Sequence, residues 1–298
     1  MAHLLAGRFG DGWRDYQQRL AVPALRPRLF DRPLWDGTPL AGRRLLVLCE
    51  QGYGDVFQFI RYLPLLRALD GPVVFECPAE LRALLAPLLG GIEVVPLAGR
   101  QSPATPFDCH VHLMSLPLLA GRAPDQIPCD VPYLHVEVPA PRRAAAGLRV
   151  GVCWAGSPTH PQDLQRSLAP EFLAPLARLP GVTLVSLQKP SRDWPALPGL
   201  DRFLQAPPQP LSDFMSTARA IAGLDLVISV DTAVAHLAGA LGRPVWLLLC
   251  SAGEWRWLVG RGDSPWYPTL RIFRQRRLGA WADLVGDVAS ALAAFTPR

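Results

Sequence analysis

The sequence predicts two α/β domains, each with a parallel β-sheet covered by helices on both faces. Apolar stretches of strand length alternate with helical patterns along most of the chain. Stretches such as residues 225–230 and 244–250 are almost continuously apolar, which is typical of strands in a parallel sheet that is buried on both faces. The alternation stops in a proline- and glycine-rich stretch, residues 115–147, and then starts again. This break indicates a junction between two domains.

Composition supports a globular protein and excludes several other classes. The chain has 298 residues, of which 50% are hydrophobic and 18% are charged, and this length suits two domains. No long uncharged apolar stretch and no secretory leader pattern is present, so we expect a cytoplasmic location. The net charge is +5, but proline, alanine and aromatic residues interrupt the arginine clusters, so no nucleic-acid partner is expected. The six cysteines form no C-x-x-C pair and predict reduced thiols without a metal.

The first half of the chain begins with a predicted helix over residues 1–20, with Gly10 as a possible break, and a proline- and arginine-rich linker. A strand at 44–49 and a helix at 55–69 follow, and Pro64 predicts a kink in that helix. The remaining predicted elements of this half are strands at 72–77, 92–97 and 107–114 and a helix at 79–89.

The second half repeats this alternation. The predicted strands are 148–154, 182–188, 225–230 and 244–250, and the predicted helices are 170–179, 211–224, 232–241 and 281–295. In open parallel sheets the ligand binds outside the C-terminal ends of the strands. We therefore expect the chemistry in the loops that follow Cys49, Cys77, Trp154, Gln188, Val230 and Cys250.

The stretch SVDTAVAH, residues 229–236, has the features of a phosphate site. Asp231 occupies the expected N-cap position between a strand and a helix, and Thr232 and His236 lie four residues apart on one helix face. The unpaired N–H groups of a helix N-terminus attract phosphate. A threonine hydroxyl and a histidine add hydrogen-bond donors. The alternative is a capped helix that contains a half-buried histidine.

The loop CEQGYGDVFQF, residues 49–59, follows the first strand. Gly52 and Gly54 match the start of a dinucleotide fingerprint, and Glu76 ends the next strand, so an NAD-dependent enzyme is one hypothesis. Phe57 replaces the third glycine, so the pattern is incomplete.

Asp55 lies in this loop and has two interpretations. The spacing of Asp55 and Gln58 matches a capping box, which favours a structural role. A carboxylate that faces a cleft from a helix N-terminus can also accept a proton, so capping does not exclude catalysis.

Other candidates follow the strands of the second half. Arg166 and Ser167 end a polar loop just before a helix predicted near Pro170, and an arginine there can bind a diphosphate with two hydrogen bonds. His160 and Asp163 are weaker candidates, and an ordinary surface loop is the alternative. Lys189, the only lysine in the chain, follows another strand, where a compact charge can reach a phosphate.

Two further patterns favour packing over chemistry. His110 and His112 lie on one face of a predicted strand, and no third metal ligand is near them in sequence. Trp255, Trp257, Trp266 and Tyr267 cluster in one region, where they can stack on a ligand or pack in the interior.

Together, GYGD at residues 52–55, Arg166-Ser167 and SVDTAVAHLAGALGRPVW resemble glycosyltransferase family 9, the ADP-heptose:LPS heptosyltransferases. The longer stretches LWDGTPLAGRRLLVLCEQGYGDVFQFIRYLPLL and WRWLVGRGDSPWYPTLRIFRQ are most similar to bacterial glycosyltransferase domains associated with tetratricopeptide (TPR) repeats. The start, LLAGRFGDGWRDYQQRL, resembles the last helices of such repeats.

The resemblance implies a GT-B fold with two Rossmann-like domains facing a cleft. It implies a TPR-like stub and linker at 1–40, an acceptor domain at 41–145, a nucleotide-sugar domain at 146–280, and a last helix at 281–298 that packs on the N-terminal domain.

The implied reaction is an inverting, metal-independent sugar transfer with no cofactor. The sugar moves from a nucleoside-diphosphate sugar to a glycan, lipopolysaccharide or protein, and contact with a membrane would occur through the acceptor only. Asp55 matches the catalytic base. Residues that match or adjoin the nucleotide site are Arg166, Ser167, Lys189, Asp231, Thr232 and His236. An inactive binding or scaffold module of the same fold is the main alternative.

Overall fold

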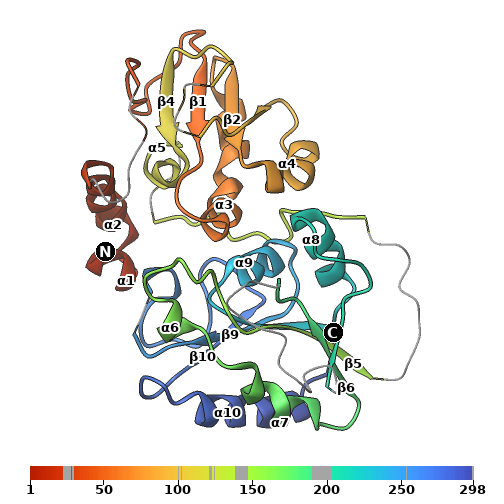
Figure 1. Ribbon diagram of the computed structural model, residues 1–298. Helices are drawn as coiled ribbons and strands as arrows, with labels where there is room; N and C mark the ends of the chain where they lie inside the picture. Colours follow the sequence, from red (N-terminus) through yellow and green to blue (C-terminus); the bar gives the residue numbers. More distant parts are fainter. Residues whose placement is uncertain are drawn as a thin grey trace. The chain divides into compact units, whose positions relative to one another are not determined.

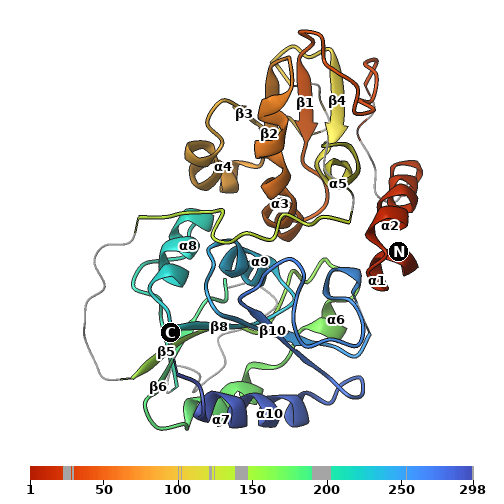
Figure 2. The same cartoon turned by 180° about the vertical axis from the view of Figure 1, so that it is seen from behind.

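The computed structural model describes residues 1–22, 28, 30–99, 101, 103–120, 123, 125–137, 147–189, 203–252 and 254–296. The chain forms two compact units, Met1–Cys129 and Asp130–Arg298. Each unit contains one parallel β-sheet with helices packed on it (Figures 1 and 2). The two-sheet α/β fold predicted from the sequence is confirmed.

The first unit contains four parallel strands in the order β3-β2-β1-β4. The strands are β1 (Leu45–Leu48), β2 (Val73–Cys77), β3 (Glu93–Pro96) and β4 (Cys109–His112). β1, β2 and β4 are buried along their whole length, as their apolar sequences predict. The order reverses at β1, which pairs with β2 on one side and β4 on the other. The loops after β1 and β4 therefore define the site where this sheet is expected to bind a ligand.

The helices of this sheet are α3 (Tyr53–Phe59), α4 (Ala79–Leu85) and α5 (Leu116–Leu119). The helix predicted at 55–69 changes to 3₁₀ geometry from Ile60 to Ala68. Pro64 explains the change, because it donates no backbone hydrogen bond and its ring clashes with the preceding turn of an α-helix. The predicted interruption at this proline is thus a change of helix type, and a kink stays a prediction.

The N-terminal segment is helical, as predicted, with α1 (Ala2–Leu5), α2 (Phe9–Tyr16) and a 3₁₀ turn at Gln17–Ala21. The break falls at Gly7, which has a φ of 75°, and the predicted break at Gly10 is wrong because Gly10 lies inside α2. Trp13 is fully buried and meets the ring of Phe59 edge-on at 5.8 Å. The segment is thus an integral part of the first unit.

The boundary between the two units follows Cys129, earlier in the chain than the predicted domain boundary after residue 145. The backbone N–H groups of Tyr133 and Leu134 both donate to the carbonyl of Ala240, so this stretch belongs to the second unit. Residues 138–146 lie outside the described residues.

The second unit contains six parallel strands in the order β10-β9-β8-β5-β6-β7. They are β5 (Leu148–Cys153), β6 (Val182–Ser186), β7 (Leu204–Gln205), β8 (Leu226–Val230), β9 (Val245–Leu249) and β10 (Leu270–Arg274). The two outermost strands were not predicted. The order reverses at β5, which pairs with β6 and β8, so the loops after β5 and β8 define the expected ligand site.

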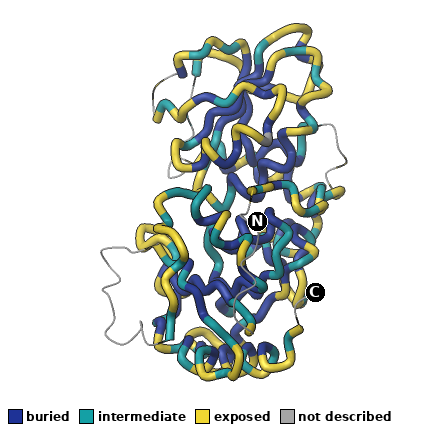
Figure 3. The backbone as a smooth tube through the Cα atoms, turned by 90° about the vertical axis from the view of Figure 1, so that its right-hand side faces the viewer, coloured by how far each residue is buried: buried dark blue, intermediate teal, exposed yellow. Residues whose placement is uncertain are grey.

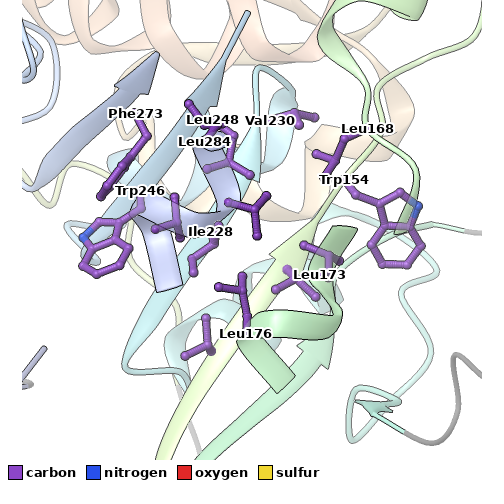
Figure 4. Packing of buried hydrophobic residues seen from close by; sticks show 14 of the residues in the cluster. Trp154, Leu168, Leu173, Leu176, Ile228, Val230, Trp246, Leu248, Phe273 and Leu284 are labelled. Carbon is purple, nitrogen blue, oxygen red and sulfur yellow. The ribbon is translucent and has the colours of Figure 1, made fainter. Parts of the chain in front are cut away.

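The helices of the second unit lie on both faces of its sheet. They are α6 (Asp163–Arg166), α7 (Ala174–Ala177), α8 (Phe214–Ala222), α9 (Ala233–Ala240) and α10 (Trp281–Ala293). α7 and α10 lie side by side on one face, and α8 and α9 lie on the other (Figures 1 and 2). The core between the sheet and α10 includes Trp246, Leu248 and Leu284 (Figure 4).

The buried chain follows the strands of both sheets, and exposed positions concentrate in loops and on outer helix faces (Figure 3). α10 packs on α7 and β10 of its own unit, and its predicted packing on the N-terminal domain stays a prediction. Within the described part of the chain, every helix is too short or too polar to cross a membrane.

Candidate functional site

The centre of the candidate site is the turn between β8 and α9. Thr232 is the N-cap of α9, and its hydroxyl accepts a hydrogen bond from the backbone N–H of Val234 at 3.3 Å. Asp231, predicted as the cap, lies one residue before it, so this prediction is corrected by one position. The helix starts at Ala233 because the extended backbone of Thr232, with φ −142° and ψ 171°, ends there. The open first turn of α9 therefore faces the C-terminal end of the sheet.

Two small polar side chains of the strands surround the Thr232 hydroxyl. The Ser229 hydroxyl oxygen lies 3.3 Å from the Thr232 hydroxyl oxygen, and the Cys153 sulfur lies 3.7 Å from it. Burial raises the pKa of the Cys153 thiol to about 11, so the thiol is protonated at neutral pH. Cys153 therefore contributes a neutral group to this end of the sheet and no thiolate nucleophile.

Arg166 joins the loop after β5 to the loop after β8. Its Nη1 donates to the backbone carbonyl oxygen of Asp231 at 3.1 Å, and its Nε donates to Asp163 at 3.3 Å. A Cβ atom at Gly156 would lie 2.3 Å from the guanidinium, so this glycine leaves the space that the guanidinium occupies. The guanidinium is thus held at the switch point of the second sheet, the place where its strand order reverses.

Ser167 supports this loop. Its hydroxyl donates to the carboxylate of Asp163 at 3.0 Å and accepts from the backbone N–H of Gly156 at 3.0 Å. Arg166 is the last residue of α6, a four-residue helix that was not predicted, and Pro170 begins a separate 3₁₀ turn.

His236 is 4% exposed and is held from three sides. Its Nδ1 lies 3.0 Å from the Tyr267 hydroxyl, its Nε2 lies 3.8 Å from the Asp231 carboxylate, and its ring stacks on Trp257 with centroids 5.1 Å apart. Of the aromatic cluster, Trp257 and Tyr267 therefore pack against the candidate site from inside the second unit. The close packing of Tyr267 requires Gly239, where a Cβ atom would lie 2.5 Å from the tyrosine ring.

Lys189 is exposed and follows β6. The neighbouring Gln188 connects its loop to the loop after β5, because the Gln188 side-chain oxygen accepts hydrogen bonds from the N–H groups of Trp154 and Ala155 at 3.2 and 3.0 Å. Cys153, Gln188 and Ser229 were not predicted as parts of this site, and for Trp257 and Tyr267 packing was preferred to contact with a ligand. Cys153, Gln188 and Ser229 lie at or near the C-terminal ends of strands, and this position could have identified them from the sequence.

In the first unit, Asp55 is the third residue of α3, and Gly52 is its N-cap. The Asp55 carboxylate accepts a hydrogen bond from the Gly52 N–H at 2.8 Å. The predicted box between Asp55 and Gln58 is wrong, because the helix begins at Tyr53 and the Gln58 side chain is fully buried. Gly54 lies within the first turn of α3.

The structure contradicts an NAD site at this loop. The Glu76 carboxylate is fully buried, pairs with Arg28 and accepts a hydrogen bond from the Ala98 N–H at 2.9 Å. A carboxylate engaged in this way does not reach a ribose. The helix cap at Gly52 and the partly exposed Asp55 fit another role for the loop.

His110 and His112 are both buried, as predicted for core or cleft-lining histidines. Burial lowers the pKa of His112 to about 4, so its imidazole is neutral at neutral pH. Among the residues that the structure describes, no cluster of three histidine, cysteine or acidic side chains could hold a metal ion. All six cysteines are free thiols, although Cys129 is exposed.

Two parallel-sheet α/β units, the second with a helix N-terminus and an arginine at the point where its strand order reverses, match the GT-B fold class. Residues 210–269 match the family model for glycosyltransferase family 9 (heptosyltransferase). This match includes the whole β8–α9 turn. The family match and the fold together support a glycosyltransferase.

Known proteins agree with this class. Protein FlbA of Caulobacter vibrioides is 29% identical over 330 residues, which cover 98% of this chain and 54% of FlbA. The chain thus spans about half the length of this curated relative. The E. coli ADP-heptose lps heptosyltransferase II aligns over 84% of this chain and 98% of its own, with 14% identity and a TM-score of 0.57.

Two other solved structures share the fold. The glycosyl transferase family 9 protein from Veillonella parvula aligns with a TM-score of 0.60 and 12% identity, covering 87% of this chain and 99% of its own. E. coli heptosyltransferase WaaC, solved with ADP-2-deoxy-2-fluoro heptose, aligns with a TM-score of 0.52 and 15% identity, covering 83% of this chain and 99% of its own. The chain is therefore similar to heptosyltransferases in fold, and to their family model in the sequence of the β8–α9 region.

Proposed function

We propose that this chain is an inverting, metal-independent glycosyltransferase. It transfers a sugar from a nucleoside-diphosphate sugar to a hydroxyl of a glycan, lipopolysaccharide or protein. A bond forms between the acceptor oxygen and the anomeric carbon, the bond from that carbon to the phosphate oxygen breaks, and the nucleoside diphosphate leaves. The observation that carries the proposal is the convergence of Thr232, Arg166 and the first turn of α9 at one strand end.

The second unit supplies the donor site. A diphosphate placed before α9 meets the N–H groups of its first turn, the hydroxyl of Thr232 and the guanidinium of Arg166. These groups stabilise the negative charge that develops on the leaving diphosphate, so no metal or cofactor is needed in the proposal. Asp231 and Tyr267 hold His236 as a further donor to the phosphates, and Ser167 and Lys189 support the same side.

Asp55 is the proposed base. Its carboxylate is fixed at the start of α3 by the Gly52 N–H, and its side chain is partly exposed. The carboxylate accepts the proton from the acceptor hydroxyl as that oxygen attacks the anomeric carbon. Gly52 and Gly54 themselves add no side chains beside it. We propose a cytoplasmic enzyme that has no nucleic-acid partner and contacts a membrane through its acceptor only.

The test is nucleotide binding to the full chain, measured by thermal shift with ADP, UDP, GDP, CDP and NAD. A ligand at about 100 times its dissociation constant stabilises the folded state by roughly 2.7 kcal/mol. We expect one nucleoside diphosphate to protect the wild type and His236→Ala to lose that protection. His135→Ala is the matched control, because His135 is an exposed histidine of the same unit and lies outside the candidate loops.

Two results would count against the proposal. Protection by NAD alone would favour a dinucleotide enzyme. If a nucleoside diphosphate binds but the donor is neither hydrolysed nor used for transfer to any acceptor in a cell extract, the inactive scaffold of the same fold is favoured.

A further inference from the structure

The first unit contains a cavity of about 600 Å³ at the C-terminal ends of its strands. Leu48 and His112, the last residues of the adjacent strands β1 and β4, line it, and so does Pro78, which follows β2. Gly52 and Tyr53, next to Asp55, form another part of the wall. The cavity is therefore at the switch point of this sheet, and its volume lies within the range of ligand pockets in proteins.

The helical N-terminal segment completes this cavity. Arg19 extends from the 3₁₀ turn at Gln17–Ala21 and is a lining residue. Its Nε and Nη2 donate to the two carboxylate oxygens of Glu50 at 2.9 and 2.6 Å. Nη2 also donates to the Ser115 hydroxyl at 2.9 Å, and Nη1 donates to the Tyr16 carbonyl at 3.1 Å. The Arg19 guanidinium is thus engaged on every nitrogen.

The second cation of the wall is also paired. Arg28 lines the cavity, and its guanidinium forms an ion pair with the fully buried Glu76 and donates to the carbonyl of Gln101 at 3.1 Å. An anionic ligand that captured Arg19 or Arg28 would leave Glu50 or Glu76 as an unpaired carboxylate in a buried position. That exchange is strongly unfavourable.

The other polar groups of the wall are neutral or negative. His112 is neutral, and its buried Nδ1 has no hydrogen-bond partner among the described residues. Burial raises the pKa of the Cys49 thiol well above its ordinary value, so the thiol is protonated. Glu80 accepts a hydrogen bond from the Tyr53 hydroxyl and forms no ion pair within the described part of the chain. Three carboxylates, those of Glu50, Glu80 and the buried Glu76 behind the wall, therefore face two guanidinium groups among the described residues.

We propose that this cavity binds the acceptor through an uncharged, hydroxyl-bearing group such as a neutral sugar ring, and that it disfavours acceptors whose bound group is an anion. The proposal rests on the proposed function, because it identifies the acceptor class of that reaction. The paired arginines hold the walls together and are not anion receptors. Carboxylate oxygens, the neutral imidazole and backbone groups provide the hydrogen-bond partners that hydroxyl groups need.

The test compares two probes that differ in one group, methyl α-D-glucopyranoside and methyl α-D-glucopyranosiduronate. Their binding to the full chain is measured by saturation-transfer NMR titration. We expect the uncharged probe to bind about ten-fold more tightly than the acid, a factor that corresponds to about 1.4 kcal/mol. Comparable or tighter binding of the acid, or no binding of either probe, overturns the proposal.

A variant that adds a cation locates the binding. Leu97 lines the cavity and is 41% exposed, so Leu97→Lys adds an ammonium at its edge without disturbing the core. We expect this variant to cancel the preference for the uncharged probe. Leu278→Lys, at an exposed leucine of the second unit, is the matched control and keeps the preference. An unchanged ratio in Leu97→Lys overturns the assignment to this cavity.

The same samples separate the two proposals. Nucleoside diphosphate protection, and its loss in His236→Ala, reports on the donor site of the second unit. If that protection is present while the probes bind with the opposite preference, the acceptor inference fails alone. If the protection is absent, the proposed function fails, whatever the probes do.

Discussion

The Nδ1 atom of His236 lies 3.0 Å from the hydroxyl oxygen of Tyr267, so the helix at the candidate phosphate site is joined to a loop 31 residues further along the chain. Because both groups are buried, this contact fixes the orientation of the imidazole ring. The other ring nitrogen then faces Asp231. The relationship makes Tyr267 a positioning residue for the proposed donor site.

Tyr267→Phe removes the hydroxyl and keeps the ring. We expect the dissociation constant of the protective nucleoside diphosphate to rise about five-fold, since a hydrogen bond contributes about 1 kcal/mol. Isothermal titration measures it. Tyr53→Phe, in the first unit, is the control and leaves this constant unchanged. An unaltered affinity in Tyr267→Phe would show that the contact does not orient His236 for the phosphates.

Gly239→Ala tests the packing behind the same tyrosine. The added Cβ would lie 2.5 Å from the Tyr267 ring, so we expect a loss of about 1–3 kcal/mol in the free energy of unfolding. Gly286→Ala in α10 is the matched control, because nothing lies within 4 Å of its added Cβ. There the better helix former stabilises the chain by about 0.5–1 kcal/mol. Chemical unfolding of both variants checks the pair, and equal effects would contradict the packing argument.

Arg19→Met tests the ion pair that anchors the N-terminal helical segment. The side chains of Arg19 and Glu50 are 4% and 13% exposed, so loss of the arginine leaves a nearly buried carboxylate unpaired. We expect the free energy of unfolding to fall by about 3–5 kcal/mol. Arg14→Met breaks the exposed pair with Asp11 and is expected to change it by less than about 0.5 kcal/mol. Similar losses in the two variants would mean that Arg19 acts as a surface charge.

His112 predicts a specific dependence of stability on pH. Burial lowers its pKa from 6.5 to about 4, so the unfolded chain binds this proton more readily than the folded chain does. Its contribution is fully present above pH 6.5 and is lost as the pH falls toward 4. The loss amounts to at most about 3 kcal/mol.

The difference in unfolding free energy between the wild type and His112→Gln isolates this contribution. We expect the difference to shrink as the pH falls through this window. A constant difference for His112→Gln would show that its imidazole titrates normally in the folded state.

Asp55→Asn tests the proposed base while keeping the fold, because the asparagine side-chain oxygen can still accept the Gly52 N–H. We expect turnover to fall by about 10²–10⁴-fold, the usual contribution of a general base. The dissociation constant of the nucleoside diphosphate should stay the same. Initial rates with a saturating donor check the prediction, and full activity would remove Asp55 from the mechanism.

Local sequence was sufficient for most of the fold. The strands and helices near β1, β5, β8 and β9 follow from continuous apolar runs and turn residues, and Pro64 marks the change of helix type. β10 was missed because arginines at 271 and 274 interrupt its apolar pattern. Those arginines are tolerated because β10 is an edge strand of the sheet.

The candidate site was predictable only in part. Two arguments placed Thr232, His236 and Arg166 in one site: ligands bind beyond the C-terminal ends of parallel strands, and the sequence resembles family 9. The structure brings the loops of Arg166 and Asp231 into contact. The bond from Tyr267 to His236 and the ion pair between Arg19 and Glu50 join residues that are more than 30 positions apart. No local pattern encodes such a pair, because it arises only when separate elements pack together.

Lys189 is the only lysine of the chain, and it is exposed on the loop beside Gln188. Apart from the terminal amine, it is therefore the single site for amine-directed labelling. A fluorophore attached there sits on the same loop as Gln188, which contacts the loop that leads to Arg166. Because acylation also removes the ammonium charge, donor binding to the labelled chain tests the proposed support of the phosphates by Lys189.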